Sequence, residues 1–191
     1  MKNANKEKIS VIMPSLNSGK FIEEAIKSCL VQDELSQIII ADGGSEDETH
    51  NILKKYSSKD SRVEWFIAKD RGPADAFNKA LKVCNSEYIG WLNADDLYIN
   101  GAFKRSLNMF HKFPNLKMIY GHGQFINKKG KFLEIYPTKW QDIKIEDFQS
   151  HCFICQPTIF IELKFIREFG GLNPNLKGTF DLDLWFKIFK N

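Results

Sequence analysis

The sequence lacks any long hydrophobic run. A helix that spans a bilayer needs about 20 consecutive, mostly apolar residues, whereas the longest stretch without a charge, 148–161, contains Gln, Ser, His and Pro. The N-terminal segment MKNANKEK is polar and has no apolar core of a secretory signal. We therefore expect a chain that is soluble as given and cytoplasmic.

Arginine is scarce, because 23 of the 27 basic residues are lysines and these are scattered along the chain. The 24 acidic residues leave a net charge of +3. Arginine dominates the bidentate recognition of phosphates and bases, so we expect no nucleic-acid partner. A mildly basic surface is compatible with an anionic membrane face.

Cysteine is also scarce: the chain has Cys29, Cys84, Cys152 and Cys155, too few for a disulfide scaffold. Cys152 and Cys155 form a C-x-x-C motif. A zinc site needs further ligands at compatible spacing, and a redox C-x-x-C stands early in its fold. We therefore expect buried free thiols, which suit a reducing compartment.

What the sequence does contain is a sizeable core, with 43% apolar and 13% aromatic residues among 191. This length and composition predict one domain over 1–191. The last helical pattern, 181–190, stops at Asn191 without a capping glycine. We therefore expect that a C-terminal extension is missing.

The first half alternates strand and helix patterns. The predicted strands are 9–13 (stopped by Pro14), 38–41, 63–68 and 88–92, and the predicted helices are 20–30, 47–56 and 74–83. Such β–α repeats predict an α/β fold of the Rossmann type, in which helices flank a mostly parallel central sheet.

The pattern after Asn100 is mixed. It predicts a helix that ends before Pro114, a strand at 117–120, a hairpin of 124–126 and 131–133, a strand at 157–161, and helices at 164–169 and 181–190.

Four loops should meet at one edge of the sheet, because ligands of such folds bind outside the carboxyl ends of the strands. These loops are 14–19, 42–47, 69–75 and 93–97. Asp42 follows a buried strand and precedes two glycines, which let the backbone approach a ligand closely. We expect Asp42 to bind a base or ribose, and Asp47 to cap the next helix.

Asp95 and Asp96 form an acidic pair at another strand end. Paired carboxylates repel each other unless a cation or donors compensate, and Mg²⁺ or Mn²⁺ binds one or two carboxylates together with substrate phosphates. The alternative is helix capping, which fits poorly because Leu97-Tyr98-Ile99 intervenes. Asp181 and Asp183 open the last helix, where acids favour the helix dipole; the residues alone leave open whether one of them is also a catalytic base.

The chain resembles the family 2 glycosyltransferases of the GT-A fold, from about Ile9 to its end. Four motifs carry the resemblance in the family's order: Ile9 to Asn17, Asp42 to Asp47, Asn93 to Asp96, and Gly170-Gly171-Leu172 followed by Asp181 to Trp185. The resemblance implies a GT-A-like fold with a mixed second half.

The resemblance also implies a set of site residues. The donor nucleotide and sugar would be bound by Pro14, Ser15, Leu16, Asn17, Asp42, Asn93, Ala94 and the loop containing Arg71, Gly72 and Asp75. Asp95, helped by Asp96, would hold a divalent metal, Mn²⁺ or Mg²⁺, and Asp181 would be the catalytic base.

Three positions depart from the family's pattern. Leu16 stands where many members carry an aromatic residue, which weakens stacking on the base. Gly43 replaces a second acid, which leaves base recognition to Asp42. Asn93 replaces the first acid of the D-x-D motif, so Asp95 must carry more of the metal binding.

The expected function is metal-assisted, inverting transfer of a hexosyl or N-acetylhexosaminyl group. The donor would be a nucleoside-diphospho-sugar, with a uridine donor favoured, and the acceptor a hydroxyl of a glycan or lipid-linked sugar. The resemblance places such transfer in surface polysaccharide synthesis at the inner face of the plasma membrane, with peripheral membrane association.

Two alternatives remain open. A sugar nucleotidyltransferase would need a glycine-rich, basic loop after the first strand, and loop 14–19 has one glycine and no arginine. A catalytically silent nucleotide-sugar-binding domain would keep the fold without turnover.

Overall fold

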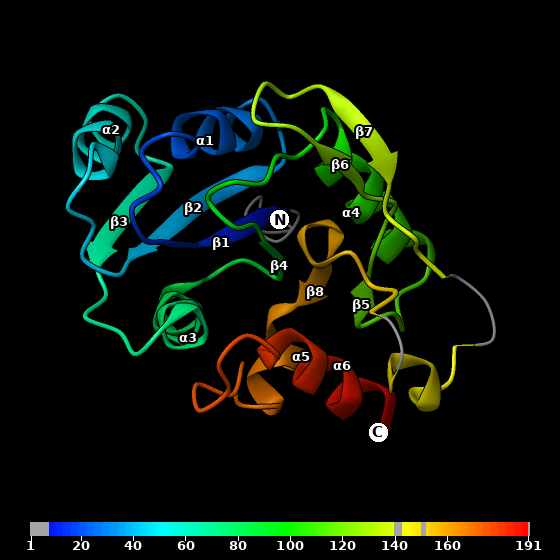
Figure 1. Ribbon diagram of the computed structural model, residues 1–191. Helices are drawn as coiled ribbons and strands as arrows, with labels where there is room; N and C mark the ends of the chain where they lie inside the picture. Colours follow the sequence, from blue (N-terminus) through cyan, green and yellow to red (C-terminus); the bar gives the residue numbers. More distant parts are fainter. Residues whose placement is uncertain (1–7, 140–142, 150–151, 191) are drawn as a thin grey trace.

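A computed structural model of the chain describes residues 8–139, 143–149 and 152–190. The polar start expected at residues 1–7 lies outside this range. A six-stranded sheet with the order β3-β2-β1-β4-β8-β5 forms the centre, and helices lie on both of its faces (Figure 1). This confirms the predicted α/β architecture. No helix in the described part of the chain is both long and apolar enough to cross a membrane.

The parallel half of the sheet follows the predicted β–α repeats. Its elements are β1 (Ile9–Ser15), α1 (Ile22–Leu30), β2 (Leu35–Asp42), α2 (Thr49–Ser57), β3 (Val63–Ile67), α3 (Pro73–Val83) and β4 (Tyr88–Trp91). The helix expected from residue 47 begins at Thr49, and its N-cap is Glu48, so the prediction that Asp47 caps it was wrong. The Asp47 carboxylate instead accepts from the backbone N–H groups of Gly19 and Thr49 and so ties the first loop to the start of the helix.

The second half adds a further set of elements. These are α4 (Ala102–Lys112), β5 (Met118–Ile119), β6 (Gln124–Ile126), β7 (Phe132–Ile135), the 3₁₀ helices η1 (Ile145–Gln149) and η2 (Gln156–Thr158), β8 (Phe160–Glu162), α5 (Leu163–Glu168) and α6 (Phe180–Lys190). β8 pairs antiparallel with both β4 and β5, which confirms the mixed second half.

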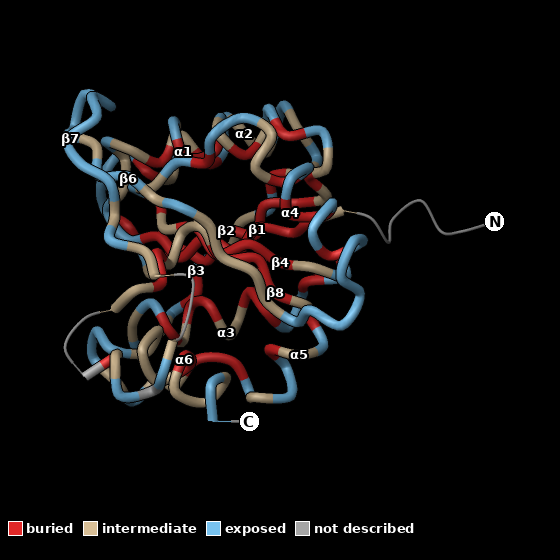
Figure 2. The backbone as a smooth tube through the Cα atoms, turned by 90° about the vertical axis from the view of Figure 1, so that its right-hand side faces the viewer, coloured by how far each residue is buried: buried red, intermediate tan, exposed pale blue. Residues whose placement is uncertain are grey.

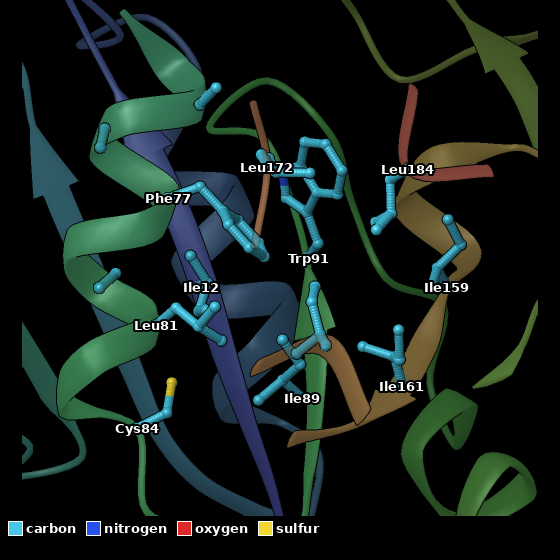
Figure 3. Packing of buried hydrophobic residues seen from close by; sticks show 14 of the residues in the cluster. Ile12, Phe77, Leu81, Cys84, Ile89, Trp91, Ile159, Ile161, Leu172 and Leu184 are labelled. Atoms are coloured by element: carbon cyan, nitrogen blue, oxygen red, sulfur yellow. The ribbon is translucent and has the colours of Figure 1, made fainter. Parts of the chain in front are cut away.

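Alternate residues of the central strands feed two separate cores. Ile12 and Ile39 pack on the face covered by α3 and α6, where Figure 3 shows Phe77 and Leu81 of α3 pointing toward Trp91 and Ile89 of β4. Val11, Met13 and Ile38 pack on the other face, against α1 and α4. Burial on both faces explains the near-continuous apolar runs, since each fully buried side chain contributes about 1.5–3 kcal/mol.

Pro14 does not end the first strand, contrary to the prediction, because β1 continues to Ser15. The carbonyl of Ile12 accepts from Leu92 N of the β4 side, whereas the carbonyl of Ser15 accepts from Gly43 N of the β2 side. Pro14 therefore faces the β4 side, where the ladder with β4 has already ended at Ile12. Its missing N–H has no ladder partner to lose there.

The strand expected at 157–161 is also displaced. Residues 156–158 form η2, and the strand begins only at Phe160. Pro157 fits the first turn of a short helix, where no N–H is needed, so the prediction was wrong for its first half.

Candidate functional site

The carboxylate of Asp42 lies fully buried at the end of β2 and holds the following loop in shape. Its Oδ1 accepts from the backbone N–H groups of Gly44 (3.0 Å) and Ser45 (2.8 Å), and its Oδ2 accepts from Ser45 Oγ (2.6 Å). His50 Nε2, on α2, lies 2.8 Å from Oδ1. The loop after β2 is therefore folded around the carboxylate of Asp42, which accepts its hydrogen bonds.

These donors also set the acidity of Asp42. Burial acts to raise the pKa of the carboxyl, but the hydrogen bonds from Ser45, His50 and Gly44 outweigh it and lower the pKa below the ordinary value of 3.8. The group stays ionised, and four contacts within the chain already occupy its oxygens. In this structure Asp42 therefore holds the loop in shape, and its carboxylate oxygens are already occupied by groups of the chain.

Asn17 joins the first loop to the second. Its backbone N–H donates to Ser45 Oγ at 2.8 Å, and its Oδ1 accepts from Glu46 N at 2.9 Å. Asn17 has a φ of 49°, a left-handed conformation that asparagine tolerates better than most residues. The polar side chain and the tight turn thus both explain asparagine at this position.

The third loop is built around Asp70 and Asp75. Asp70 Oδ1 accepts from Gly72 N at 2.9 Å, and Asp75 Oδ2 accepts from Arg71 N at 3.1 Å. Lys79 Nζ lies 3.2 Å from Asp75 and donates to the carbonyl of Ala68 at 2.7 Å. Burial acts to raise the pKa of Asp75, but Lys79 and Arg71 outweigh it and lower the pKa. The Arg71 side chain is 68% exposed, so it can reach outward.

Gly43 brings the second loop close to the first and the third. A Cβ added to Gly43 would lie 3.4 Å from both Asp70 Oδ2 and Leu16 Cδ1, and 3.6 Å from the carbonyl oxygen of Ser15. Asp70 Oδ2 and Ser15 Oγ are both buried without a hydrogen-bond partner among the described residues. Leu16 is 61% exposed. One unpaired carboxylate oxygen, from Asp70, and one apolar side chain, Leu16, therefore lie beside Gly43.

The acidic pair follows β4 at the same edge. Asp95 is exposed and Asp96 half-buried, while Ala94 is buried. Burial, and then the charge of Asp95, raise the pKa of Asp96 to about 6. Neither acid caps α4, whose N-cap is Gly101, so the capping alternative is excluded.

Within the described ranges, no three His, Cys, Asp or Glu side chains are grouped to enclose a metal ion. Two adjacent carboxylates, one of which raises the proton affinity of the other, nevertheless fit a divalent cation that takes its remaining ligands from a diphosphate. Asp95 and Asp96 are the residues that would hold it.

Asp181 is brought to this edge by the first turn of α6. Phe180 packs on Trp91, at the end of β4, with ring centroids 5.9 Å apart. Burial chiefly raises the pKa of Tyr136, followed by the neighbouring Cys152, and Asp181 adds a smaller contribution. Burial, and then the charge of Asp96, raise the pKa of Cys155 to about 11. Asp181 therefore lies near Tyr136, and Asp96 lies near Cys155.

Asp183 has a different role from Asp181. Its carboxylate pairs with Lys187 one turn further along α6, at 2.7 Å, whereas Asp181 Oδ1 accepts from the neighbouring Leu182 N, at 2.8 Å. Asp183 is the acid that supports the helix. The cysteines Cys29, Cys84 and Cys155 are buried thiols and Cys152 is partly buried, as expected.

The sequence placed Asp70 in loop 69–75 without a role of its own, and it did not predict His50 as a functional residue. Asp70 carries a recognisable signal, since it follows the third strand at the edge where the other loops meet. His50 and Gln156, which contacts Asn93 at 2.8 Å, offer no such signal because both reach the site only through tertiary packing.

Several known proteins resemble this chain over most of its length. A glycosyltransferase of Rickettsia felis without assigned function is 31% identical over 95% of this chain, which spans 31% of that protein. Another, from Rickettsia typhi, is 30% identical over 95% of the chain and 58% of its own length. Chondroitin synthase of Escherichia coli is 26% identical, with coverage of 94% and 26%. The chain thus spans about a third to three fifths of the Rickettsia proteins.

Solved structures share the fold. S. aureus TarS 1-349 in complex with UDP-GlcNAc superposes with a TM-score of 0.73 at 22% identity, over 92% of this chain and 51% of that one. Mannosyltransferase PcManGT from Pyrobaculum calidifontis, in complex with GDP-Man and Mn²⁺, has a TM-score of 0.65 at 15% identity, with coverage of 92% and 51%. Both support the GT-A fold. The family model for glycosyl transferase family 2 matches residues 10–168, and the chain belongs to that family.

Proposed function

We propose that this chain transfers a sugar from a nucleoside-diphosphate donor to an acceptor hydroxyl, with inversion at the sugar. The observation that carries the proposal is the meeting of acidic groups at one edge of the sheet: Asp70 beside Gly43, the pair Asp95 and Asp96, and Asp181. The family and the fold support it, as does the nucleotide sugar in the TarS and PcManGT complexes.

The base of the donor would bind beside Gly43. Uracil, thymine and guanine each present a ring N–H that can donate a hydrogen bond to the unpaired Oδ2 of Asp70. Cytosine presents a ring nitrogen without hydrogen, which the carboxylate would repel. Leu16 would cover the base by apolar contact. Pro14 would lie at the base of this site, and Asp42 and Asn17 would hold its two loops in shape.

The diphosphate would lie beside Asp95 and Asp96, with Arg71 and the Asn93-Ala94 segment around it. A divalent ion bound there supplies charge stabilisation to the leaving diphosphate. Asp95, the exposed acid, would contribute an oxygen ligand, and Asp96, whose proton affinity is raised, would support it. Gly72 and Asp75 keep the Arg71 loop in shape.

Asp181 would accept the proton of the attacking hydroxyl. A hydroxyl is a poor nucleophile until a positioned base takes its proton, and Asp183, engaged by Lys187, does not compete for that role. One base opposite the leaving group gives a single displacement and therefore inversion. The acceptor, a glycan or lipid-linked hydroxyl in polysaccharide synthesis at the inner membrane face, is part of the same proposal.

Calorimetric titration tests the donor site first. We expect UDP, or else GDP or dTDP, to bind with a requirement for Mn²⁺, and CDP to bind at least about tenfold more weakly, because one lost hydrogen bond beside a buried carboxylate costs about 1–3 kcal/mol. Asp70→Ala should reduce the preference against CDP. Equal binding of all four nucleotides would contradict the role of Asp70.

Turnover separates an enzyme from a silent binding domain. A chain that binds a nucleotide sugar with Mn²⁺ and neither transfers nor hydrolyses it would support the binding-domain alternative. Absence of any nucleotide binding would contradict the proposed function itself.

A further inference from the structure

Gln156 links the end of β4 to the Asn93–Asp96 loop. It opens η2, half-buried, just before β8. Its Nε2 donates to the carbonyl of Trp91 at 2.7 Å, and its Oε1 accepts from Asn93 Nδ2 at 2.8 Å. Asn93 Nδ2 also donates to Asp96 Oδ2, at 3.2 Å. A chain of side-chain amides thus runs from the strand to the acidic pair.

The orientation of both side-chain amides is determined by their hydrogen-bond partners at the two ends of this network. A backbone carbonyl only accepts, so Gln156 must turn its NH₂ group toward Trp91 and its oxygen toward Asn93. That oxygen only accepts as well, so Asn93 must turn its NH₂ group toward Gln156. The carboxylate of Asp96 imposes the same orientation from the other side. An amide whose two ends are otherwise hard to tell apart has one allowed orientation here.

Both N–H groups of Asn93 are therefore engaged, and the amide has its carbonyl oxygen to offer a ligand. We propose that Gln156 is a positioning residue that fixes Asn93 so that this oxygen serves the cation-bound diphosphate of the donor. The inference rests on the proposed function. It explains how asparagine works where the family's pattern has an acid: one oxygen ligand is kept, and both N–H groups are bound by Gln156 and Asp96.

A double-mutant cycle tests the proposal. Gln156→Met keeps the bulk of the side chain and removes both hydrogen bonds, and Asn93→Asp replaces the amide by a group with oxygen on both sides. The measurement is Mn²⁺-dependent UDP affinity by calorimetry in all four combinations. Gln124→Met, an exposed residue of β6, is the matched control.

In the chain that keeps Asn93 we expect Gln156→Met to weaken Mn²⁺-dependent binding by about tenfold or more, as for other residues that orient metal ligands. In the chain that carries Asn93→Asp, Gln156→Met should leave Mn²⁺-dependent UDP affinity unchanged. An aspartate has an oxygen on both sides, so its orientation no longer matters. The substitution also removes the Gln156 oxygen, which would otherwise face that carboxylate. An equal loss in both backgrounds, as expected for packing alone, would overturn the proposal.

A second readout needs no ligand. The side-chain amide protons of Asn93, followed by NMR in the free protein, should both be protected from solvent exchange, and Gln156→Met should remove the protection of one. Unprotected protons, or protection unchanged by the substitution, would overturn the network even if nucleotide binding is observed. If no nucleotide binds, the proposed function fails, and this readout still decides whether Gln156 orients Asn93.

Discussion

The loops of the proposed donor site, 14–19, 42–47 and 69–75 (the donor-side loops), and the β6–β7 hairpin are held in shape by different means. The loops after β1 and β2 are bonded to each other through the buried Asp42 and Ser45 and the exposed Asn17. The hairpin closes on itself through Asn127 and exposes Phe132, Leu133 and Ile135 by 51%, 58% and 66% (Figures 1 and 2). The proposed donor site is thus preorganised by the fold, whereas we expect the hairpin to contribute little to the fold's stability.

If this contrast is correct, donor binding and transfer can be separated. Asp181→Asn should lower transfer by about 10²–10⁴-fold, because the acceptor hydroxyl loses its base. UDP affinity should stay unchanged, because the donor-side loops do not use Asp181. Initial rates with a sugar donor, together with calorimetry, measure both quantities. Full transfer in this variant would show that the base lies elsewhere.

We expect the divalent cation to be required for binding of the donor nucleotide. Asp95→Ala should weaken Mn²⁺-dependent UDP binding by about 10–100-fold, because an oxygen ligand of the cation is lost. Binding measured in EDTA should change little. Glu46→Ala, at another exposed acid of the same edge, is the control for the loss of one negative charge. Unchanged Mn²⁺ dependence would contradict the assignment.

The donor-side loops should also contribute to stability in a pH-dependent way. Asp42→Asn should reduce the free energy of unfolding by about 1–2 kcal/mol at neutral pH, because hydrogen bonds to an ionised acceptor are lost. The folded-state pKa lies below the ordinary 3.8, so the carboxylate stabilises fully above pH 3.8 and loses this effect as pH falls through the folded value.

The difference in the free energy of unfolding between the unsubstituted protein and Asp42→Asn, measured with urea, should therefore be largest at neutral pH and shrink below pH 3.8. A difference that is constant from about pH 7 to about pH 3 would mean that Asp42 acts only through packing. His50→Ala, which removes one donor to the same carboxylate, should produce a smaller loss with the same pH dependence.

The smallest effect is expected at the hairpin. Ile135→Ser should change the free energy of unfolding by no more than about 0.5 kcal/mol, since an exposed side chain loses little burial. Ile12→Ala, from the fully buried β1, should cost about 2–5 kcal/mol. A large loss at Ile135 would show that the hairpin is part of the fold's core, and would break the comparison.

Much of the donor side could be predicted from sequence, because its signals are local. Apolar runs and the acids that follow them correctly predicted the strands of the parallel half and the edge where Asp42 and Asp95 lie. Asp42 illustrates the limit: its position was predictable, but the four contacts that occupy its carboxylate come from the loop and α2 together.

The second half was less predictable because its pairings are not local. Nothing in the sequence around Phe160 indicates that β8 lies between β4 and β5. Gln156 depends on that same return of the chain, so its contact with Asn93 could not be predicted from spacing. The prediction at Pro14 was wrong because β1 extends beyond its ladder with β4, and a proline is tolerated where a strand has no partner on that side.

The placement of β8 has a consequence for the order of events as the chain is made. β5 ends at Ile119, yet its strand partner is β8, which begins at Phe160. The parallel half, from β1 to β4, contains all its own parallel pairings and can form while the ribosome is still adding later residues. The donor-side loops should therefore take shape first, and the contact that orients Asn93 should be among the last to form.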